Sequence, residues 1–541
     1  MTEIRSTPPR GVGEGPRART GRAGRTSVGE RPLLASAAIE HPSAARRGVP
    51  APFLRSALRL AVRALALAAT VAVTVLVVRA VDARGMPPLE PWHRLVPRGE
   101  VTAAGIARMD SLADYLERES VLFREVATTL ADDPSPTARL ATSRYNPDGP
   151  LHPSRFAIDG NRTREVAPHA PWQGPPRAGA LLLHGLTDAP YSLHAVADRL
   201  AAGGVVSLAI RLPGHGTVPA ALTTARWEDW LAAARLGMRH VRATIGPDKP
   251  LLVVGYSNGA ALAMLLALES LEPADAGSAD LPRPDAVLLL SPMVAVSPAA
   301  RIGRLFGSLA IVPGLEQSGW YEILPEYLPF KYTSFPLQAA RESAALTDAL
   351  AARLARAESD HRLDALPPVL AFQSLADSTV STLAVASHLF AHLPGAHHEL
   401  VIFDLNRSSD FRPFLQQPGP ERLKELRVAT ARGARLTVVT NASPATTAVV
   451  EQRDGHDRPL GLAWPSQVHS LSHVALPFPP DDPLYGREGP GLRLGALEPR
   501  GEKGVLVVPV EQLMRLTWNP FFPYLAERLD TWAASAPHTT R

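Results

Sequence analysis

Residues 251–259, LLVVGYSNG, decide how the fold of this chain is interpreted. Four apolar residues lead into Gly255-Tyr256-Ser257-Asn258-Gly259, and the apolar run AALAMLLAL follows. This order predicts a buried strand, a tight turn that carries Ser257, and a helix. A serine on such a turn has a strained backbone, and side chains at Gly255 and Gly259 would collide with neighbouring backbone. The turn exposes the Ser257 hydroxyl and directs the Asn258 amide, at the helix N-terminus, toward a developing oxyanion.

Two further strand-and-loop motifs lie upstream of this turn. Residues 178–183 (AGALLL) predict a short buried strand that ends in His184-Gly185-Leu186-Thr187-Asp188. Residues 205–211 (VVSLAIR) predict another strand, which leads into LPGHGT. Together, LLLHGLTDAPYS, RLPGHGT and GYSNG resemble the α/β-hydrolase superfamily, specifically its monoacylglycerol-lipase/carboxylesterase and serine-aminopeptidase-like branch. The resemblance is specific over residues 178–292 and looser beyond them.

The resemblance implies a mostly parallel, doubly wound α/β sheet and a catalytic triad in the order serine, acid, histidine. It also implies that Leu186 supplies an oxyanion-hole amide beside that of Asn258. The predicted strand 368–374 (PVLAFQS) is followed by Asp377, where the superfamily places the carboxylate that orients the histidine. A helix N-cap at the same position is the alternative role for Asp377.

The histidine is harder to identify. His388, His392, His397 and His398 follow too soon, because a helix and a strand must still return the chain to the active-site edge. His388 and His392 stand four apart on a predicted helix, a spacing that suits a metal, but no general-base glutamate or third ligand accompanies them, which favours a solvated helix face. The segment PSQVHSLSHVAL contains His469 and His473; we prefer His473 because small and apolar residues surround it. It lies 96 residues after Asp377, a longer gap than the fold requires.

The first 84 residues predict a tail and a membrane segment. Residues 1–56 are rich in Arg, Pro, Gly and Ser and are predicted to be disordered. Residues 57–84 contain the apolar run 60–81, whose flanking arginines can snorkel and extend it to the ~20 residues that span a bilayer. Residues 1–63 contain twelve Arg and four Glu, so the positive-inside rule places this tail in the cytoplasm. A cleaved signal peptide is the alternative, because Val81-Asp82-Ala83 fits a cleavage site.

The rest of the chain divides into a helical pre-domain, residues 85–175, and a hydrolase domain, residues 176–533. A helix is predicted over residues 101–129, with a structural role of packing on the hydrolase body. Residues 293–366 form a predicted cap rich in aromatic residues, which either cover an acyl chain or form the cap's own core. Residues 404–435 are interpreted as a polar surface insertion. Asp481 and Asp482, in a Pro-rich loop after His473, are interpreted as surface turn residues.

Composition excludes several other classes of protein. The 541 residues contain no cysteine, which excludes disulfides and thiolate metal sites. The formal net charge of +4 comes from arginine, with only four lysines, and no nucleic-acid motif, phosphate-binding loop or repeat accompanies it. We therefore predict no cofactor, no metal and no nucleic-acid partner.

The predicted function is a serine hydrolase of lipid-like or acylated carboxylic esters, held in the inner membrane with its catalytic domain facing the periplasm or exterior. Ser257 attacks the acyl carbonyl, His473 takes its proton, and Asp377 orients His473. A serine aminopeptidase or thioesterase using the same residues is an alternative. A non-catalytic envelope binding protein on the same scaffold is another.

Overall fold

The structure is a computed structural model that describes residues 51–131, 135–273, 281–295, 310, 312–410, 419–430, 433–488 and 514–536. The predicted disordered tail lies outside the described residues as far as residue 50. Two compact units are distinguished, residues 1–68 and residues 69–541. The elements of the candidate active site all belong to the second unit.

Ten strands form one sheet, in the order β1-β3-β2-β4-β5-β8-β9-β10-β11-β12. Their bounds are β1 Arg164–Val166, β2 Ala178–Leu183, β3 Val205–Ile210, β4 Leu251–Tyr256, β5 Ala286–Leu290, β8 Val369–Ser374, β9 Glu399–Phe403, β10 Arg435–Asn441, β11 Ala448–Arg453 and β12 His456–Ala463. Neighbours from β3 to β10 pair in parallel, whereas β1 at one edge and β11 and β12 at the other are antiparallel. The predicted mostly parallel α/β sheet is therefore confirmed.

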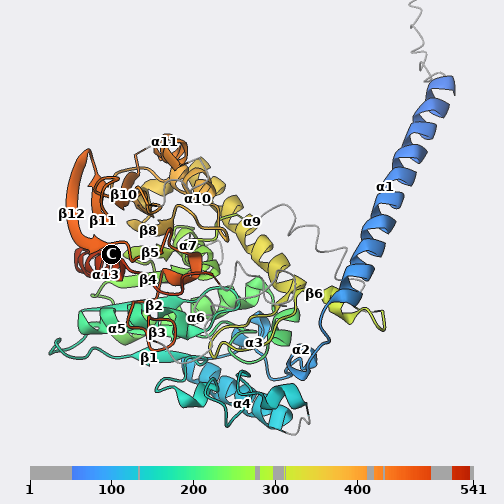
Figure 1. The fold of residues 1–541 in the computed structure, drawn as a ribbon, viewed down its shortest axis with the longest axis horizontal. Helices are drawn as coiled ribbons and strands as arrows, with labels where there is room; N and C mark the ends of the chain where they lie inside the picture. The colour runs from blue at the N-terminus through green and yellow to red at the C-terminus, as the bar shows by residue number, and fades with distance from the viewer. Residues whose placement is uncertain are drawn as a thin grey trace, which may run out of the picture. The chain divides into compact units, whose positions relative to one another are not determined.

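Helices cover both faces of this sheet (Figure 1). They are α5 His194–Ala202, α6 Trp227–Ile245, α7 Asn258–Glu269, α9 Leu337–Ser359, α10 Thr382–His388, α11 Gly419–Ala429 and α13 Phe522–Ser535. Side chains alternate along each strand. Leu181 and Leu183 accordingly join a buried cluster with α6, α7 and α9, while Leu182 joins a second cluster with α5 and α13. The strands are apolar on both sides because both faces are buried.

The segment before the sheet contributes to the same core as the sheet. In place of one helix over residues 101–129, the structure has α3 (Ala103–Ile106) and α4 (Leu112–Ala131), separated at Ala107–Ser111. Tyr115 of α4 is fully buried in the cluster that contains β2 and β3. Strand β1 also lies in this segment, outside the helix predicted over residues 101–129; its three residues are too few to show a period-two pattern.

A buried ion network joins α4 to the end of β3. The Arg211 guanidinium is fully buried, 3.0 Å from a Glu100 oxygen and 3.1 Å from a Glu119 oxygen. The Tyr115 hydroxyl donates to the Arg211 carbonyl oxygen (2.7 Å). Two carboxylates therefore compensate one buried cation. Removing Arg211 or either glutamate would leave a charge in the network without its partner.

Replacing Glu119 by alanine is expected to destabilise the protein by ~3 kcal/mol, because the change leaves a buried guanidinium partly uncompensated. The measurement is the free energy of unfolding in denaturant. Glu117→Ala is the matched control, since Glu117 is exposed on the same helix and its loss should cost less than about 0.5 kcal/mol. Equal stability of the two variants would contradict an integral role for α4.

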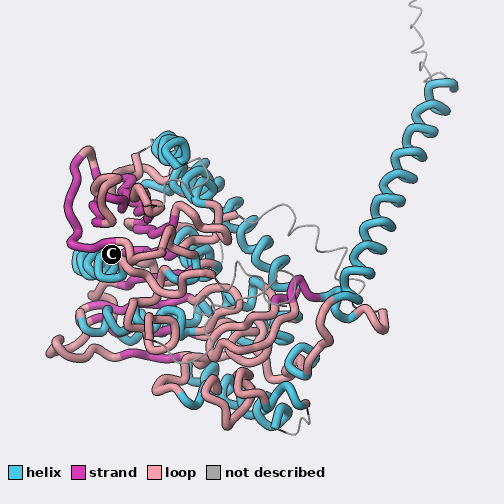
Figure 2. Tube along the Cα trace, viewed as in Figure 1, coloured by secondary structure: helices cyan, strands magenta, loops and turns pink. Residues whose placement is uncertain are grey.

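Residues 404–435, interpreted as a polar surface insertion, connect two strands of the sheet. The segment contains α11 and connects β9 to β10, which pair in parallel, so it is a crossover that extends the sheet. Strands β11 and β12 then form an antiparallel hairpin, and β12 is the edge strand of the sheet (Figure 2). These additions, rather than a loop, occupy most of the sequence between Asp377 and His473.

The predicted membrane segment forms a single helix, α1 (Ala51–Gly85). Residues Leu58–Gly85 have a mean hydropathy of 2.3 and bury none of their most apolar window inside the protein. In the described part of the chain, this is the one helix long and apolar enough to cross a bilayer.

Candidate active site

Ser257 lies on a strained turn between β4 and α7. Its φ of 53° and ψ of −116° lie outside the regions that a non-glycine residue normally adopts. A Cβ atom at Gly259 would lie 2.0 Å from the Leu183 carbonyl oxygen, and one at Gly255 would lie 2.4 Å from the backbone of α7. Both positions therefore require glycine so that the turn can pack against β2. The Ser257 side chain is held at the carboxyl edge of the sheet.

The loop after β2 lies directly beside Ser257. A Cβ atom built on Gly185 would lie 3.2 Å from the Ser257 Cβ, which shows how closely the two segments approach. Leu186 is half-buried in this loop, and Asn258 is the first residue of α7. The first N–H groups of a helix have no acceptor within the helix. The two backbone amides predicted for the oxyanion hole thus belong to segments that flank the serine.

His184 has a structural role in this loop. Its Nε2 accepts from the Leu212 N–H (3.0 Å), so its Nδ1 carries the proton and donates to the Gly185 carbonyl oxygen (2.9 Å). Burial lowers the pKa of His184 to about 3. A neutral histidine therefore connects the loop after β2 to the end of β3, which explains why HG and RLPGHG occur together in the sequence.

The stability of the fold is expected to decrease as the pH falls below about 6.5, the usual histidine pKa. Burial lowers the pKa values of His93, His184 and His398 to about 3 in the folded protein. Between pH 6.5 and 3 the unfolded chain therefore binds protons that the folded chain excludes, which favours unfolding. We expect a lower Tm at pH 5 than at pH 7.5; an unchanged or higher Tm at pH 5 would contradict this.

Asp377 and His473 are joined by a hydrogen bond of 2.7 Å between Oδ2 and Nδ1. Both side chains are buried. Burial alone would raise the pKa of Asp377, but His473 and the N–H groups of Thr379 and Val380 outweigh it and hold the pKa below its ordinary value. Asp377 is therefore an ionised acceptor that fixes the His473 tautomer with its proton on Nδ1 and leaves Nε2 free to accept one.

The loop that carries His473 is tied to the ends of β8 and β9. The Ser374 hydroxyl donates to the Leu471 carbonyl oxygen (2.6 Å), and the Asn406 side-chain amide donates to the Val468 carbonyl oxygen (3.0 Å). His473 begins a short 3₁₀ turn and is only 4% exposed, whereas His469 is exposed. The structure thus brings His473, and not His469, to Asp377.

Tyr256 lies between the serine turn and the histidine. Its ring centroid is 5.4 Å from that of His473, and its hydroxyl donates to the His473 carbonyl oxygen (3.4 Å). In the described part of the chain, no hydrogen bond joins the Ser257 hydroxyl to His473. Such contacts often tighten only when substrate binds.

Two contacts that support the site were not recognised in the sequence. Gln373, buried on β8, donates to Asp377 Oδ2 (2.9 Å), the same oxygen that His473 contacts. Lys331 of the cap contacts Thr187 Oγ1 (3.1 Å) and Asp188 Oδ1 (2.9 Å) in the loop after β2. A polar glutamine inside the apolar strand VLAFQS was a usable signal for the first contact. No local pattern indicates the second, because more than 140 residues separate its partners.

The cap connects to the hydrolase body mainly through buried aromatic residues. One buried cluster combines cap and body residues: Tyr327, Phe330, Tyr191, Phe478 and Tyr485. The Tyr332 hydroxyl accepts from the Thr217 N–H (2.7 Å), whereas Tyr321 is 68% exposed. Phe306 lies outside the described residues. Most of the described rings therefore pack between cap and body. This role differs from the two predicted ones, which were to cover an acyl chain or to form the cap's own core.

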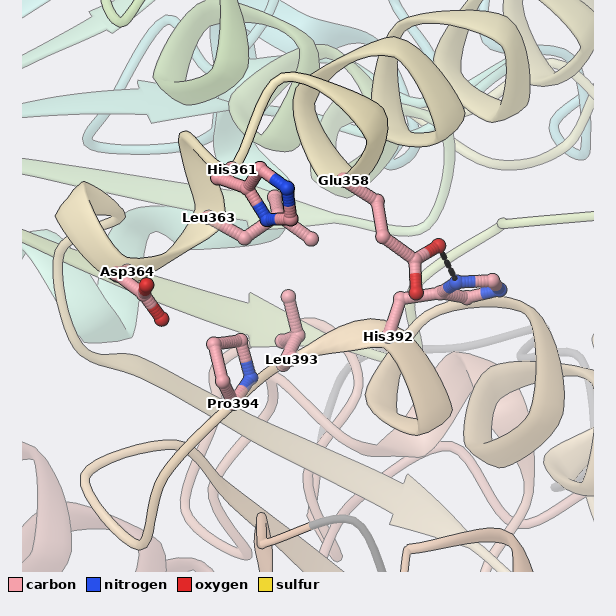
Figure 3. A pocket seen from close by; sticks show the side chains of 7 residues that line it. All are labelled: Glu358, His361, Leu363, Asp364, His392, Leu393 and Pro394. Carbon is pink, nitrogen blue, oxygen red and sulfur yellow. Dashed lines mark hydrogen bonds and ion pairs between the residues drawn. The ribbon is translucent and has the colours of Figure 1, made fainter.

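The paired histidines downstream of Asp377 do not share a helix. Helix α10 ends at His388, and His392 lies in a separate 3₁₀ turn. Figure 3 shows His392 bonded to Glu358 (2.7 Å) at the rim of a cavity of about 230 Å³. Among the residues described, no group of three His, Cys, Asp or Glu side chains is arranged to bind a metal ion.

Asp482 is not a surface residue. It is 3% exposed, and its Oδ1 accepts from the Leu484 and Tyr485 N–H groups at 2.8 and 2.7 Å. His194 Nε2 lies 3.1 Å from its other oxygen. Asp482 therefore shapes the Pro-rich loop from inside, and only Asp481 is exposed as predicted.

The region that contains the central strands and Ser257 matches a known family. Residues 174–405 match the family model described as "Serine aminopeptidase, S33". The thermostable monoacylglycerol lipase of Bacillus sp. (strain H-257) is 32% identical over 89 residues, which is 16% of this chain and 34% of the lipase. The chain therefore aligns with about a third of that curated relative.

Solved structures of lipolytic enzymes are more distant. One, reported with the metagenome-derived lipolytic enzymes LipS and LipT, is 19% identical with a TM-score of 0.35, covering 50% of this chain and all of that one. The monoacylglycerol lipase of Paleococcus ferrophilus is 15% identical with a TM-score of 0.32, covering 50% and 98%.

Proposed function

We propose that this chain hydrolyses carboxylic esters with Ser257 as nucleophile. The premise is that residues 174–405 belong to the α/β-hydrolase superfamily, in the branch of S33 serine aminopeptidases and monoacylglycerol lipases. The observation that carries the proposal is the hydrogen bond between Asp377 and His473, formed beside a serine whose backbone is strained. An ionised acid, an oriented histidine and a serine on a strained turn are the parts that acyl transfer requires.

In this mechanism the Ser257 hydroxyl oxygen attacks the acyl carbonyl while His473 Nε2 accepts its proton. The Leu186 and Asn258 amides donate to the oxyanion of the tetrahedral intermediate. His473 then protonates the leaving alcohol, and an acyl-Ser257 ester remains. Water, deprotonated by His473, attacks this ester and releases the carboxylic acid.

A fluorophosphonate probe and a panel of p-nitrophenyl esters of increasing acyl length test this proposal. Covalent labelling of Ser257, with turnover of the esters, supports it. Turnover of aminoacyl p-nitroanilides or acyl thioesters in preference to esters would assign the same residues to an aminopeptidase or thioesterase. No labelling and no turnover would indicate a binding protein that uses the hydrolase scaffold.

We further propose that Leu58–Gly85 anchors the enzyme in the inner membrane, with the Arg-rich tail in the cytoplasm and the hydrolase domain on the opposite side. Helix length and hydropathy support a bilayer span, and the excess of arginine before it supports the orientation. A lipid-like ester would then reach the enzyme from the membrane surface.

The full-length protein is expected to stay in the membrane fraction after salt and alkaline carbonate washes, because apolar burial rather than charge holds a spanning helix. A reporter that is active only outside the cytoplasm, fused after Arg541, should be active. A mature N-terminus near Arg84 would indicate a cleaved signal peptide. Recovery of the intact chain from the cytosol would contradict both arrangements.

A further inference from the structure

A large groove lies away from the proposed catalytic residues. It has a volume of about 1030 Å³ and runs between α4, residues 138–162 and the loop after β3. All its lining residues except Gly216 and Thr217 precede residue 174, where the family match begins. The groove is therefore built by the segment that this chain adds before its matched hydrolase region, and its volume is of the size that small-molecule ligands occupy.

One wall of the groove is an apolar helix face. Phe123, Val126, Ala127 and Leu130 of α4 all line it. Their spacing of three, one and three residues places them on one side of the helix. Phe156 adds an aromatic surface from the segment 138–162. A wall of this kind offers an alkyl chain continuous apolar contact.

A buried guanidinium that forms no direct ion pair with a described residue lies in the groove wall. Arg144 is 2% exposed, and its Nη1 and Nη2 donate to the Lys331 carbonyl oxygen and to Asn161 Oδ1, each at 3.2 Å. Its Nε has no partner. Within the described ranges, no carboxylate oxygen lies within 4.0 Å of it. A guanidinium has five N–H donors, so Arg144 keeps unused donors, and the buried carboxylate that acts on it electrostatically, Glu326, is bonded instead to the N–H groups of Thr333 and Ser334.

The other charged residues that line the groove form no ion pair with Arg144. Asp159 is paired with Arg162 through a contact of 2.7 Å, and the Arg162 guanidinium stacks over the Phe123 ring at 4.0 Å. Arg139 and Asp148 are exposed, so water screens both of them. Among the charged residues that line the groove, Arg144 alone is buried.

We propose that this groove binds an amphipathic anion, a single alkyl chain with a carboxylate or phosphate head group. The chain lies along the apolar face of α4, and the head group pairs with Arg144. A carboxylate of this kind is also the acid that ester hydrolysis releases, but binding in the groove requires no chemistry at Ser257. The inference therefore goes beyond the proposed function and can hold or fail independently of it.

Photo-crosslinking of the full-length protein tests the site. The protein carries Ser257→Ala, so that no probe is turned over, and is kept in amphipol because detergent would compete. Three diazirine probes with the same ten-carbon chain are compared: a carboxylate, a phosphate and an uncharged alcohol. The carboxylate, the phosphate or both are expected to label peptides from α4 and residues 138–162, in competition with decanoate, and the response to each identifies the head group.

Two pairs of variants sharpen the test. Ala127→Trp fills the groove from an exposed helix position, whereas Thr128→Trp places the same ring on the same helix outside it. Ala127→Trp is expected to reduce labelling about tenfold, and Thr128→Trp to leave it unchanged. Arg144→Met should weaken anion labelling about tenfold, the effect of losing a charged hydrogen bond, without changing the weak labelling by the alcohol. Arg144→Lys, which retains the charge, should restore part of the labelling.

Circular dichroism and Tm measurements confirm that each variant is folded before its labelling is compared. Equal labelling by the alcohol and the anions would overturn the proposal. So would labelling confined to peptides outside α4 and residues 138–162, or undiminished labelling in folded Ala127→Trp and Arg144→Met proteins.

Discussion

Ser257→Ala is expected to reduce kcat/KM for p-nitrophenyl esters by ~10³-fold or more, because the hydroxyl oxygen is the atom that forms the acyl-enzyme bond. Any remaining rate would come from the oxyanion-hole amides and from substrate binding. Fluorophosphonate labelling should be lost together with turnover. The Tm should change little, since alanine can occupy the same turn and the hydroxyl contributes little to packing.

Ser291→Ala is the matched control for this experiment. Ser291 follows the neighbouring strand β5, is fully buried and also has a positive φ, of 45°. The two substitutions remove the same group from buried residues with a positive φ, and Ser257 is the one whose Cβ approaches Gly185 in the loop after β2. We expect Ser291→Ala to retain esterase activity and probe labelling. Near wild-type turnover by Ser257→Ala would eliminate the proposed mechanism.

The central strands could be predicted because each carries its own local signal. AGALLL, VVSLAI and LLVVGY are short apolar runs bounded by glycine-rich turns, and parallel strands buried on both faces have this composition. The turn at Ser257 was predictable for the same reason: its two glycines are required by contacts with backbone close in sequence or on the adjacent strand.

Elements whose conformation depends on distant partners were missed or mispredicted. Residues 404–435, interpreted as a surface excursion between two strands, include α11 within a parallel crossover to β10, a helix that the sequence analysis did not identify. Asp482 was assigned to the surface because it follows prolines, yet its side chain accepts from two buried N–H groups. The Arg211 network has the same origin, since its glutamates are contributed by residues about 90 and 110 positions earlier. Hydrophobic periodicity contains no information about such pairs.

The long interval between Asp377 and His473 is explained by the extended sheet. After β9 the chain adds β10, β11 and β12 before it returns to the carboxyl edge. The returning loop is held there by Ser374 and Asn406, which follow or end the strands nearest to it. The number of residues between acid and base is thus unconstrained, provided that these contacts place the histidine on Asp377.

His473→Ala is accordingly expected to lose as much esterase activity as Ser257→Ala, ~10³-fold or more, and the double variant should be no worse than either single variant. Residues that act as one unit give losses that do not add. In the alanine variant the Ser257 proton has no acceptor, and Asp377 is left without the group it orients. The measurement is kcat/KM for one ester across the two single variants and the double variant.

His469→Ala is the matched control, because the two histidines are four residues apart in the same loop but only His473 is buried against Asp377. Its expected loss is less than about fivefold, typical of an exposed side chain outside the reacting groups. An inactive His469→Ala protein beside an active His473→Ala protein would transfer the role of base to His469. That result would require the loop to shift when substrate binds, because Asn406 contacts the backbone at residues 468 and 469 and leaves the His469 ring exposed. Additive losses in Ser257→Ala/His473→Ala would instead show that the two residues act in separate steps.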